Sequence, residues 1–524
     1  MKSSKGQNTK QYKTIIIGAG ASGLYCACSL SKAAMPALIL ERTNKPGTKL
    51  LMAGGGQCNV THGGSIKDFV SHYGKNGKKI RGVLQKHNNL ELHRFFESLS
   101  IHLVEREDGK IFPASMRGRD ILDALLAEIS RKGVETKYNA KVVEIIASQE
   151  RGDLSKANAS ETSNAANASA YETTNSPKDG AYETTNLPKD SACETTNLPN
   201  DRACEGTNLP NVESVVRGTV SANAEIRLGA NNSPNVEICR NEEKGQGADD
   251  LPNVEICRKT NLRFTVKTQD DRFSCDNLVI ATGGCSYPTT GSDGQMFEIL
   301  RRDLNVEIAK PSPALTSVKA EKYPYEQLTG IGFKEVSLKI TTGKEVYNCQ
   351  GDLLFAGQKL SGPVILNNSR YMEVGSILQI NYISPTTGPE AIARFKAEFP
   401  GNGKSPQTYV GENFNLPKRF VQKIVDDLNI GQRKVSHLTG AEMKALAVAL
   451  TEAPLKISSL SGFKEAMVTR GGVALSQIKF PKMESATFKG LYFIGEAVDI
   501  DGDTGGYNLQ FAYSSARAAA DNIE

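Results

Sequence analysis

The segment from Thr14 to Glu41 constrains the fold more than any other part of this sequence. It reads as an apolar strand, a glycine-rich turn from Gly18 to Gly23, a helix of small residues, and a second apolar strand that ends at Glu41. In such a segment the first glycine permits a tight turn, the second lets N–H groups approach a pyrophosphate, and the third lets helix and strand pack closely. The terminal acid is placed to accept hydrogen bonds from a ribose diol. The segment therefore predicts a dinucleotide site, and the acid favours FAD or NAD over NADP.

Length and composition narrow the class of protein. A chain of 524 residues predicts two or three domains. Its net charge of +5 is small, and no dense Lys/Arg tract is interleaved with aromatics, so we expect no nucleic-acid partner. No apolar run reaches the roughly 20 residues of a membrane span, and we expect a cytoplasmic protein with reduced cysteines. The six histidines show no HxxxH spacing and the cysteines no CxxC pair, which predicts no metal site.

Residues 149–260 differ in character from the rest of the chain. A Tyr-Glu-Thr-Thr-Asn unit at Tyr171 recurs with drift at Tyr182, Cys193 and Cys204. These units contain too few large apolar residues to build a stacked solenoid core, so we expect a disordered, low-complexity insert. Because residues 141–146 and 262–268 both read as strands, the insert is predicted to be an overgrown hairpin loop.

Three further glycine-rich segments extend the predicted site. Gly54 to Asn59 permits backbone approach to a flat or anionic group, and its asparagine can both donate and accept hydrogen bonds. Ala281 to Gly284 ends an apolar strand, the place where ligands lie in an open parallel sheet. Glu496 is suited to polyol hydroxyls, and Gly505 to Leu509 opens the last helix, whose N–H groups can meet a carbonyl edge.

Together these segments resemble one family, the BaiN-like (YhiN-like) FAD-dependent oxidoreductases. The resemblance covers nearly all of the chain outside the insert, and its Gly-Gly-Gly-x-Cys-Asn and Gly-Gly-Tyr-Asn-Leu signatures are specific. The residues that carry it are Gly18 to Gly23, Glu41-Arg42, Gly54 to Thr61, Ala281 to Gly284, Ser286-Tyr287-Pro288, Leu354-Phe355, Ser361-Gly362-Pro363, Met483-Glu484-Ser485 and Gly490 to Gln510.

The resemblance implies an α/β fold in which a Rossmann-like FAD-binding domain, three-layered with a mostly parallel sheet, is interrupted by a β-barrel plus helical domain. The FAD-binding domain would comprise residues 12–148, 261–310 and 481–524, and the inserted substrate domain residues 311–480. On this basis Glu41 binds the adenosine ribose, Gly18 to Gly23 the pyrophosphate and Glu496 the ribityl chain. Gly505 to Leu509 would face the pyrimidine edge and Gly54 to Asn59 the isoalloxazine.

The full set of residues expected to bind the cofactor is Gly18, Ala19, Gly20, Ala21, Ser22, Gly23, Glu41, Arg42, Lys49, Gly54, Gly55, Gly56, Gln57, Cys58, Asn59, Val143, Thr282, Gly283, Gly495, Glu496, Gly505, Gly506, Asn508 and Leu509. The candidate catalytic donors are Tyr507, Asn59 and Cys58. A Thr-His pair that is frequent in the family is replaced here by Ala356-Gly357, which puts any role of that histidine in doubt.

Members of the family include reductases of conjugated 3-oxo bile acids. The resemblance therefore implies an NAD(P)H-dependent reductase of a C=C bond conjugated to a ketone, acting on a small apolar molecule such as a 3-oxo-4,6-diene bile acid. Hydride would pass from reduced flavin to the β-carbon while a donor polarises the carbonyl. A flavin oxidase or dehydrogenase of an amine or alcohol, and a flavin-containing RNA-modifying protein, are the alternatives. The sequence leaves the oligomeric state open.

Overall fold

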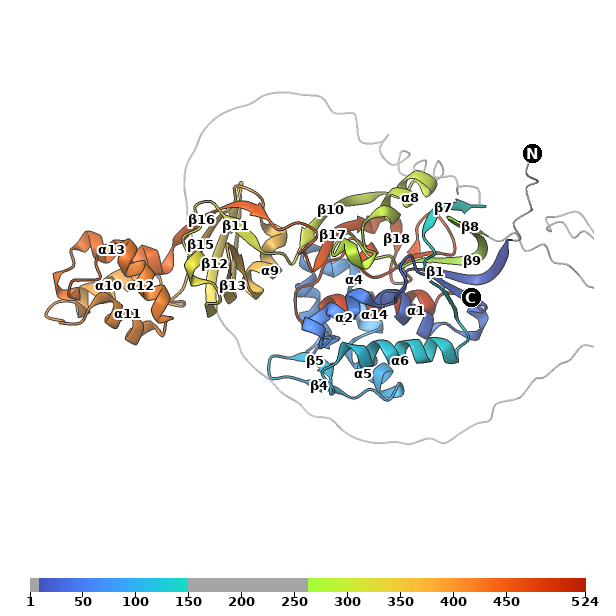
Figure 1. Cartoon of the computed structure of the whole chain (residues 1–524), viewed down its shortest axis with the longest axis horizontal. Helices are drawn as coiled ribbons and strands as arrows, with labels where there is room; N and C mark the ends of the chain where they lie inside the picture. The colour runs from blue at the N-terminus through green and yellow to red at the C-terminus, as the bar shows by residue number, and fades with distance from the viewer. Residues whose placement is uncertain (1–8, 149–262) are drawn as a thin grey trace, which may run out of the picture. The chain divides into compact units, whose positions relative to one another are not determined.

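The structure is a computed structural model that describes residues 9–148 and 263–524, and these belong to one compact unit (Figure 1). The expected disorder of residues 149–260 lies outside the described residues. Within the described part, a parallel sheet forms the core of the FAD-binding domain, and a barrel with four main helices is inserted between two of its segments. This arrangement confirms the expected fold class.

The central sheet places the first glycine-rich turn at its carboxyl edge. Its parallel strands are, in spatial order, β20 (Leu491–Phe493), β9 (Arg272–Ile280), β1 (Lys10–Ile17), β2 (Ala37–Leu40) and β6 (Glu135–Lys137). Two short antiparallel strands, β18 (Ile478–Lys479) and β19 (Glu484–Ser485), extend it beyond β20. Ile15, Ile16 and Ile17 are at most 4% exposed, as expected for a strand covered on both faces.

Helices and a small sheet pack around these strands. The helices of the FAD-binding domain are α1 (Ala21–Ser29), α2 (Thr48–Met52), α3 (Ile66–Phe69), α4 (Gly77–Lys86), α5 (Asn89–Ser98), α6 (Gly118–Arg131), α8 (Gln295–Leu304) and α14 (Tyr507–Ala520). A three-stranded sheet orders β3 (Thr61–His62), β5 (Lys110–Pro113) and β4 (Leu103–Glu105). Helix α14 packs closely on α1, so the last segment of the chain meets the first. The N-termini of both helices therefore belong to one region of the domain.

The inserted domain has a core of its own. Strands β10 (Ile308–Ala314) and β17 (Val468–Val473) pair at its base. Between them, a closed barrel orders β11 (Val318–Ala320), β14 (Lys359–Ser361), β13 (Glu345–Ala356), β12 (Gly332–Thr342), β15 (Ile377–Asn381) and β16 (Ala453–Leu460). The associated helices are α9 (Pro363–Asn368), α10 (Gly388–Glu398), α11 (Pro406–Phe414), α12 (Lys418–Asp427) and α13 (Gly440–Thr451). Phe333, Phe355 and Phe420 join the barrel core to the helices through edge-to-face and tilted ring contacts.

The strands that flank the repeat-containing segment pair with each other. Strand β7 (Val142–Ala147) is antiparallel to β8 (Phe264–Thr268), and the pairing continues to the last described residues, where Ser148 N donates to the Arg263 carbonyl at 2.8 Å. Strands β7 and β8 therefore hold the two ends of the segment together.

We predict that deleting Arg151 to Lys259 leaves the fold and the FAD content intact. Closure entropy rises only logarithmically with loop length, so the shortened loop should stabilise the protein by at most about 2–3 kcal/mol. Thermal unfolding and the flavin-to-protein absorbance ratio of the purified deletion variant provide the measurement. Insoluble protein, or soluble protein without flavin, would contradict the prediction.

Candidate functional site

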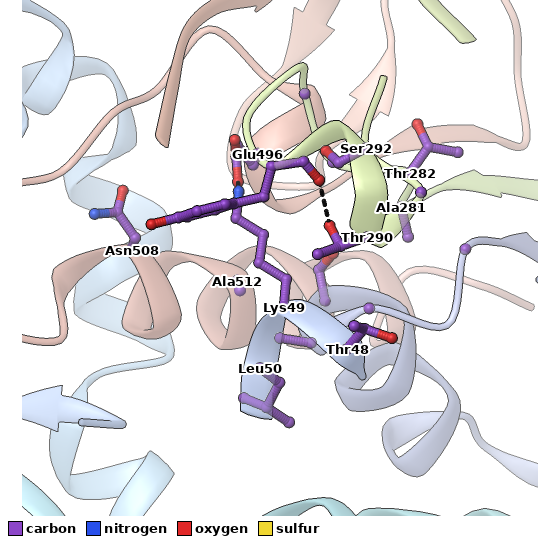
Figure 2. A pocket seen from close by; sticks show the side chains of 18 of the residues that line it. Thr48, Lys49, Leu50, Ala281, Thr282, Thr290, Ser292, Glu496, Asn508 and Ala512 are labelled. Atoms are coloured by element: carbon purple, nitrogen blue, oxygen red, sulfur yellow. Dashed lines mark hydrogen bonds and ion pairs between the residues drawn. The ribbon is translucent and has the colours of Figure 1, made fainter. Parts of the chain in front are cut away.

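A cavity of about 520 Å³ lies where the carboxyl ends of β1, β9 and β20 meet. Its walls come from all of the segments that the sequence singled out, including Gly18 to Ser22, Glu41, Gly54, Thr282 and Gly505. Figure 2 shows Lys49, Glu496, Asn508 and Thr290 facing the cavity from different elements. The residues brought together are thus far apart in the sequence and meet at the edge where open parallel sheets bind ligands.

The three glycines of the first turn have different structural roles. Gly18 has φ +106°, and a Cβ there would lie 2.6 Å from the Ala281 carbonyl oxygen. A Cβ on Gly23 would lie 2.0 Å from the Gly18 carbonyl oxygen. Gly20 has an ordinary φ of −79°, and a Cβ there would have no neighbour within 4 Å. Gly18 and Gly23 are therefore required by the fold, whereas Gly20 leaves space at the start of α1 for a ligand.

The start of α1 is open to an anion. Gly20 is the N-cap of this helix, and no side chain caps its first N–H groups. Such free N–H groups and the positive end of the helix dipole favour a pyrophosphate. Glu41 is 7% exposed and accepts hydrogen bonds from Ala19 N at 2.7 Å and from the Thr43 hydroxyl at 2.7 Å. Its carboxylate is therefore held beside the turn, with acceptor capacity remaining for a ribose diol.

A hydrogen-bonded network surrounds Glu496. Lys49 Nζ lies 2.5 Å from Glu496 Oε2, and the Ser286 hydroxyl donates to Glu496 Oε1 at 2.5 Å. Lys49 also donates to the Ser286 hydroxyl at 2.5 Å, and Thr469 N donates to Glu496 Oε1 at 2.9 Å. The network joins α2, the segment after β9, β17 and the segment after β20. It fixes both Lys49 and Glu496 on the cavity wall (Figure 2).

The loop before α14 is tied down from two directions. The Asn508 side chain donates to the Gly502 carbonyl and accepts from Gly502 N, each at 2.8 Å. Arg370, from the inserted domain, donates to Asp503 at 2.7 Å and approaches Asp501 at 3.3 Å. Burial raises the pKa of Asp501 to about 6, although Arg370 opposes the shift. The inserted domain thereby helps to hold the loop that precedes the uncapped N-terminus of α14.

Three polar side chains on the cavity wall have buried oxygens that no residue in the described part of the chain satisfies. They are Asn59 Oδ1, Thr282 Oγ1 and Ser292 Oγ. Buried polar atoms in native proteins nearly always have a partner, so these three indicate that a polar ligand completes the site. Together with the open space at Gly20 and the free N–H groups of α1 and α14, they fit FAD.

Some predicted site residues do not line the cavity. Cys58 is fully buried, and burial raises its thiol pKa to about 12. Tyr507 is 4% exposed, its pKa is raised by burial, and its ring stacks on those of His62 and His72 at centroid distances of 5.2 and 4.1 Å. The other predicted residues outside the lining are Gly23, Gly56, Gln57, Val143 and Gly495. Val142 lines the cavity in place of its neighbour because successive strand residues face opposite sides.

Several lining residues were not among the predicted ones. Phe112, Leu315, Met52 and Met467 supply apolar surface, and Tyr287 contributes a phenol. Met52 and Met467 are 46% and 43% exposed. No glycine motif marks the four apolar residues, whereas Tyr287 belongs to the Ser-Tyr-Pro motif of the family resemblance.

The structure also bears on metals, thiols and membranes. Among residues 9–148 and 263–524, no cluster of three or more His, Cys, Asp or Glu side chains is suited to a metal ion. The six cysteines in these ranges are free thiols. None of the helices in these ranges has the length and apolar character required to cross a bilayer.

The parallel sheet, the glycine-edged cavity and the unsatisfied oxygens on its wall define a flavoprotein of the Rossmann type. The family model of the HI0933-like protein Rossmann domain matches residues 12–184 and 239–522, and the chain belongs to this family of FAD-dependent oxidoreductases. The family membership confirms the resemblance noted in the sequence.

Curated relatives match the chain over nearly its whole length. The ribosomal RNA dihydrouridine synthase of Haemophilus influenzae is 25% identical over 515 residues, which is 98% of each chain. The 3-dehydro-bile acid delta(4,6)-reductase of Clostridium scindens is 22% identical over 522 residues, 97% of this chain and 98% of that protein. The 3-ketosteroid-delta4-(5alpha)-dehydrogenase from Rhodococcus jostii is 12% identical with a TM-score of 0.43, covering 99% of this chain and 98% of the other.

We predict that Gly20→Ala impairs FAD binding, whereas Gly23→Ala impairs folding. The Cβ of Gly20→Ala enters open space, so the apoprotein should fold normally but bind FAD about tenfold or more weakly, because the methyl group obstructs the pyrophosphate. Gly23→Ala should not give soluble protein, since its Cβ overlaps the Gly18 carbonyl. Circular dichroism and titration of the apoproteins with FAD measure both effects. Wild-type FAD affinity in Gly20→Ala would contradict a pyrophosphate at this turn.

Proposed function

We propose that the protein is an FAD-dependent reductase of a C=C bond conjugated to a carbonyl, with NAD(P)H as its source of electrons. The observation that carries this proposal is a cavity whose lining suits FAD, in a chain whose curated relatives act on the same kind of double bond. Dihydrouridine differs from uridine by two hydrogens on a ring C=C bond conjugated to a carbonyl. The Δ4,6 double bonds of a 3-dehydro-bile acid are conjugated to a carbonyl in the same way.

The chain's own residues hold the cofactor and polarise the reacting groups. Glu41 and the start of α1 bind the adenosine and pyrophosphate end, and the Glu496 network binds the ribityl chain. The N–H groups at the start of α14 stabilise negative charge on the pyrimidine edge of the flavin ring. Bound FAD supplies the hydride for the reduction. Within residues 9–148 and 263–524, the central sheet is the one parallel sheet, so the nicotinamide is expected to reach the flavin through the same cavity.

Anaerobic mixing of the purified flavoprotein with NADH or NADPH tests the electron donor. We expect one or both to bleach the flavin absorbance, and a conjugated enone or a uridine-containing RNA to restore it. Failure of both nucleotides would contradict the proposed donor. Rapid peroxide formation with an amine or alcohol, without reoxidation by an enone or by RNA, would indicate an oxidase instead.

An apolar edge of the cavity favours a steroid as one candidate substrate. Phe112, Leu315, Met52 and Met467 present apolar surface around it, and methionine side chains adapt to ligands of varied shape. Such an edge suits the ring system of a 3-oxo-4,6-diene bile acid, the type of substrate that the name of the Clostridium relative specifies.

A group of exposed cations on α3, α4 and the turn between them favours a uridine in RNA as the second candidate. Lys67, Lys75, Lys78, Lys79 and Arg81 are exposed, and none of their side chains has an ion-pair or hydrogen-bond partner in the described ranges. We call these five residues the cationic face. Unpaired cations of this kind attract a phosphate backbone.

The cationic face is connected to the cavity. Its residues belong to α3, α4 and the intervening turn, and α4 packs on α14. Within the turn, the His72 imidazole bonds to Asp503, which lines the cavity, at 3.0 Å. The small net charge of the chain conceals this local excess of cations. On these observations we favour RNA over a steroid, in contrast to the expectation from composition.

Reversing charges on the cationic face tests whether the substrate is RNA or a steroid. Lys78→Glu/Lys79→Glu should weaken RNA binding by at least about tenfold and reduce its salt dependence, while reduction of a small enone stays unchanged. Lys396→Glu/Lys444→Glu, at exposed and unpaired lysines on α10 and α13, is the matched control. Transcribed ribosomal RNA, free uridine and a 3-oxo-4,6-diene steroid are the test substrates, with dihydrouridine content measured by mass spectrometry. Equal losses in both variants, or turnover of the steroid alone, would contradict an RNA substrate.

A further inference from the structure

Tyr287 is the one tyrosine in the described ranges that lines the cavity. It follows Ser286, whose hydroxyl belongs to the Glu496 network, so the backbone of Tyr287 lies next to the expected ribityl position. Its hydroxyl has no hydrogen-bond partner in the described ranges. A free phenol at this place is available to a ligand.

The backbone at Tyr287 is strained. Its φ of +52° and ψ of +64° lie in the left-handed region, which costs an aromatic residue energy and is rare outside glycine and asparagine. Tyr287 also precedes Pro288, which does not relieve this cost. Such strain persists only where the surrounding structure enforces it, and it concentrates at active sites.

Backbone contacts on both sides enforce the conformation. Tyr287 N donates to the Phe463 carbonyl of the inserted domain at 2.9 Å. The Tyr287 carbonyl accepts from Thr290 N at 2.9 Å and from the Thr290 hydroxyl at 2.8 Å (Figure 2). The chain thus fixes Tyr287 between the FAD-binding domain and the inserted domain.

Several neighbouring donors on the cavity wall are already engaged. Lys49 bonds to both Glu496 and Ser286, and the Thr290 hydroxyl bonds to the Tyr287 carbonyl. The Asn508 amide donates to backbone carbonyls of its own loop. The hydroxyls of Thr282 and Ser292, by contrast, are buried and have no partner among the described residues. The phenol of Tyr287 is therefore one of the neutral hydroxyl donors on the wall that remain free for a substrate, and it is the most acidic of them, since a phenol is a stronger acid than the alcohols of Ser and Thr.

We propose that the Tyr287 hydroxyl donates a hydrogen bond to the substrate carbonyl. This assignment rests on the proposed function and replaces Tyr507, whose ring is buried outside the cavity. As hydride from reduced FAD adds to the β-carbon, negative charge moves onto the carbonyl oxygen, and a preorganised donor stabilises it. The resulting enolate then takes up a proton from water at the α-carbon, which completes the reduction. A uridine and a 3-oxo steroid both present such a carbonyl, so the role is the same for either substrate.

The experiment compares three full-length, FAD-loaded variants with the wild type. Tyr287→Phe removes only the hydroxyl and should lower kcat for reduction of the C=C bond by about 10²- to 10³-fold. Tyr507→Phe tests the donor suggested by the sequence and should change kcat less than about threefold, as expected for a ring outside the cavity. Tyr347→Phe, on the barrel strand β13, is the control for an unrelated hydroxyl.

Three further measurements on Tyr287→Phe distinguish a catalytic role of the hydroxyl from a structural one. Because the Tyr287 hydroxyl has no partner within residues 9–148 and 263–524, Tyr287→Phe should keep the wild-type melting temperature, the FAD dissociation constant of the apoprotein and the rate of flavin bleaching by NAD(P)H. A lower melting temperature or weaker FAD binding would identify a structural role instead.

The two proposals fail in different ways. If the wild type is active and Tyr287→Phe retains wild-type kcat, the assignment of Tyr287 is wrong and the proposed function stands. If the wild type reduces neither the enone nor the RNA, the proposed function is wrong, and the assignment falls with it.

Discussion

The close approach of three backbone segments at Gly18, Gly23 and Ala281 is the constraint on which the rest of the site depends. Here β1, α1 and the end of β9 come so near to one another that a single Cβ on either glycine would overlap a carbonyl oxygen. The segment after β20 also lies close to α1, because a Cβ on Gly495 would lie 2.5 Å from the Ser22 hydroxyl oxygen. Because protein interiors do not compress, the position of the α1 N-terminus relative to β1, β9 and β20 is fixed by this packing.

A second, polar constraint joins segments that the inserted domain separates in the sequence. Lys49, Ser286 and Glu496 meet around one carboxylate, and Thr469 adds a backbone N–H from the strand that leaves the inserted domain. Lys49 and Glu496 are only partly buried, so their attraction contributes little to overall stability. The main effect of the network is geometric, because it sets the orientation of Lys49 and Glu496 on the cavity wall. Arg370 has a similar geometric effect on the loop before α14, because its bond to Asp503 ties this loop to the inserted domain.

Local patterns in the sequence predicted the parts of the site that are themselves local. The strand, turn and helix around Gly18 and the acid at Glu41 follow from adjacent residues and backbone sterics, and the fold class followed from the family motifs. The direction of individual side chains could not be predicted from these local patterns. Tyr507 and Asn508 are neighbours on α14, yet only Asn508 lines the cavity, because one residue turns a helix by about 100°. Tyr287 could not be ranked as a donor, since its left-handed backbone depends on a contact with Phe463, far away in the chain.

The choice between substrates depends on surfaces outside the FAD site. Hydride transfer to a conjugated C=C bond makes the same demands for a uridine and a steroid, so residues that bind the cofactor and polarise the carbonyl cannot distinguish the two. Discrimination requires contacts with the remainder of the substrate, which is a phosphate backbone in one case and an apolar ring system in the other. The cationic face favours the first, whose many phosphates outnumber the single carboxylate of a bile acid. The exposed methionines at Met52 and Met467 can pack against either a steroid or an unstacked base. An apolar edge is therefore compatible with both substrates. A phosphate backbone can contact several cations of the cationic face at once, whereas the single carboxylate of a bile acid can pair with few of them, and this asymmetry is the physical reason for preferring RNA.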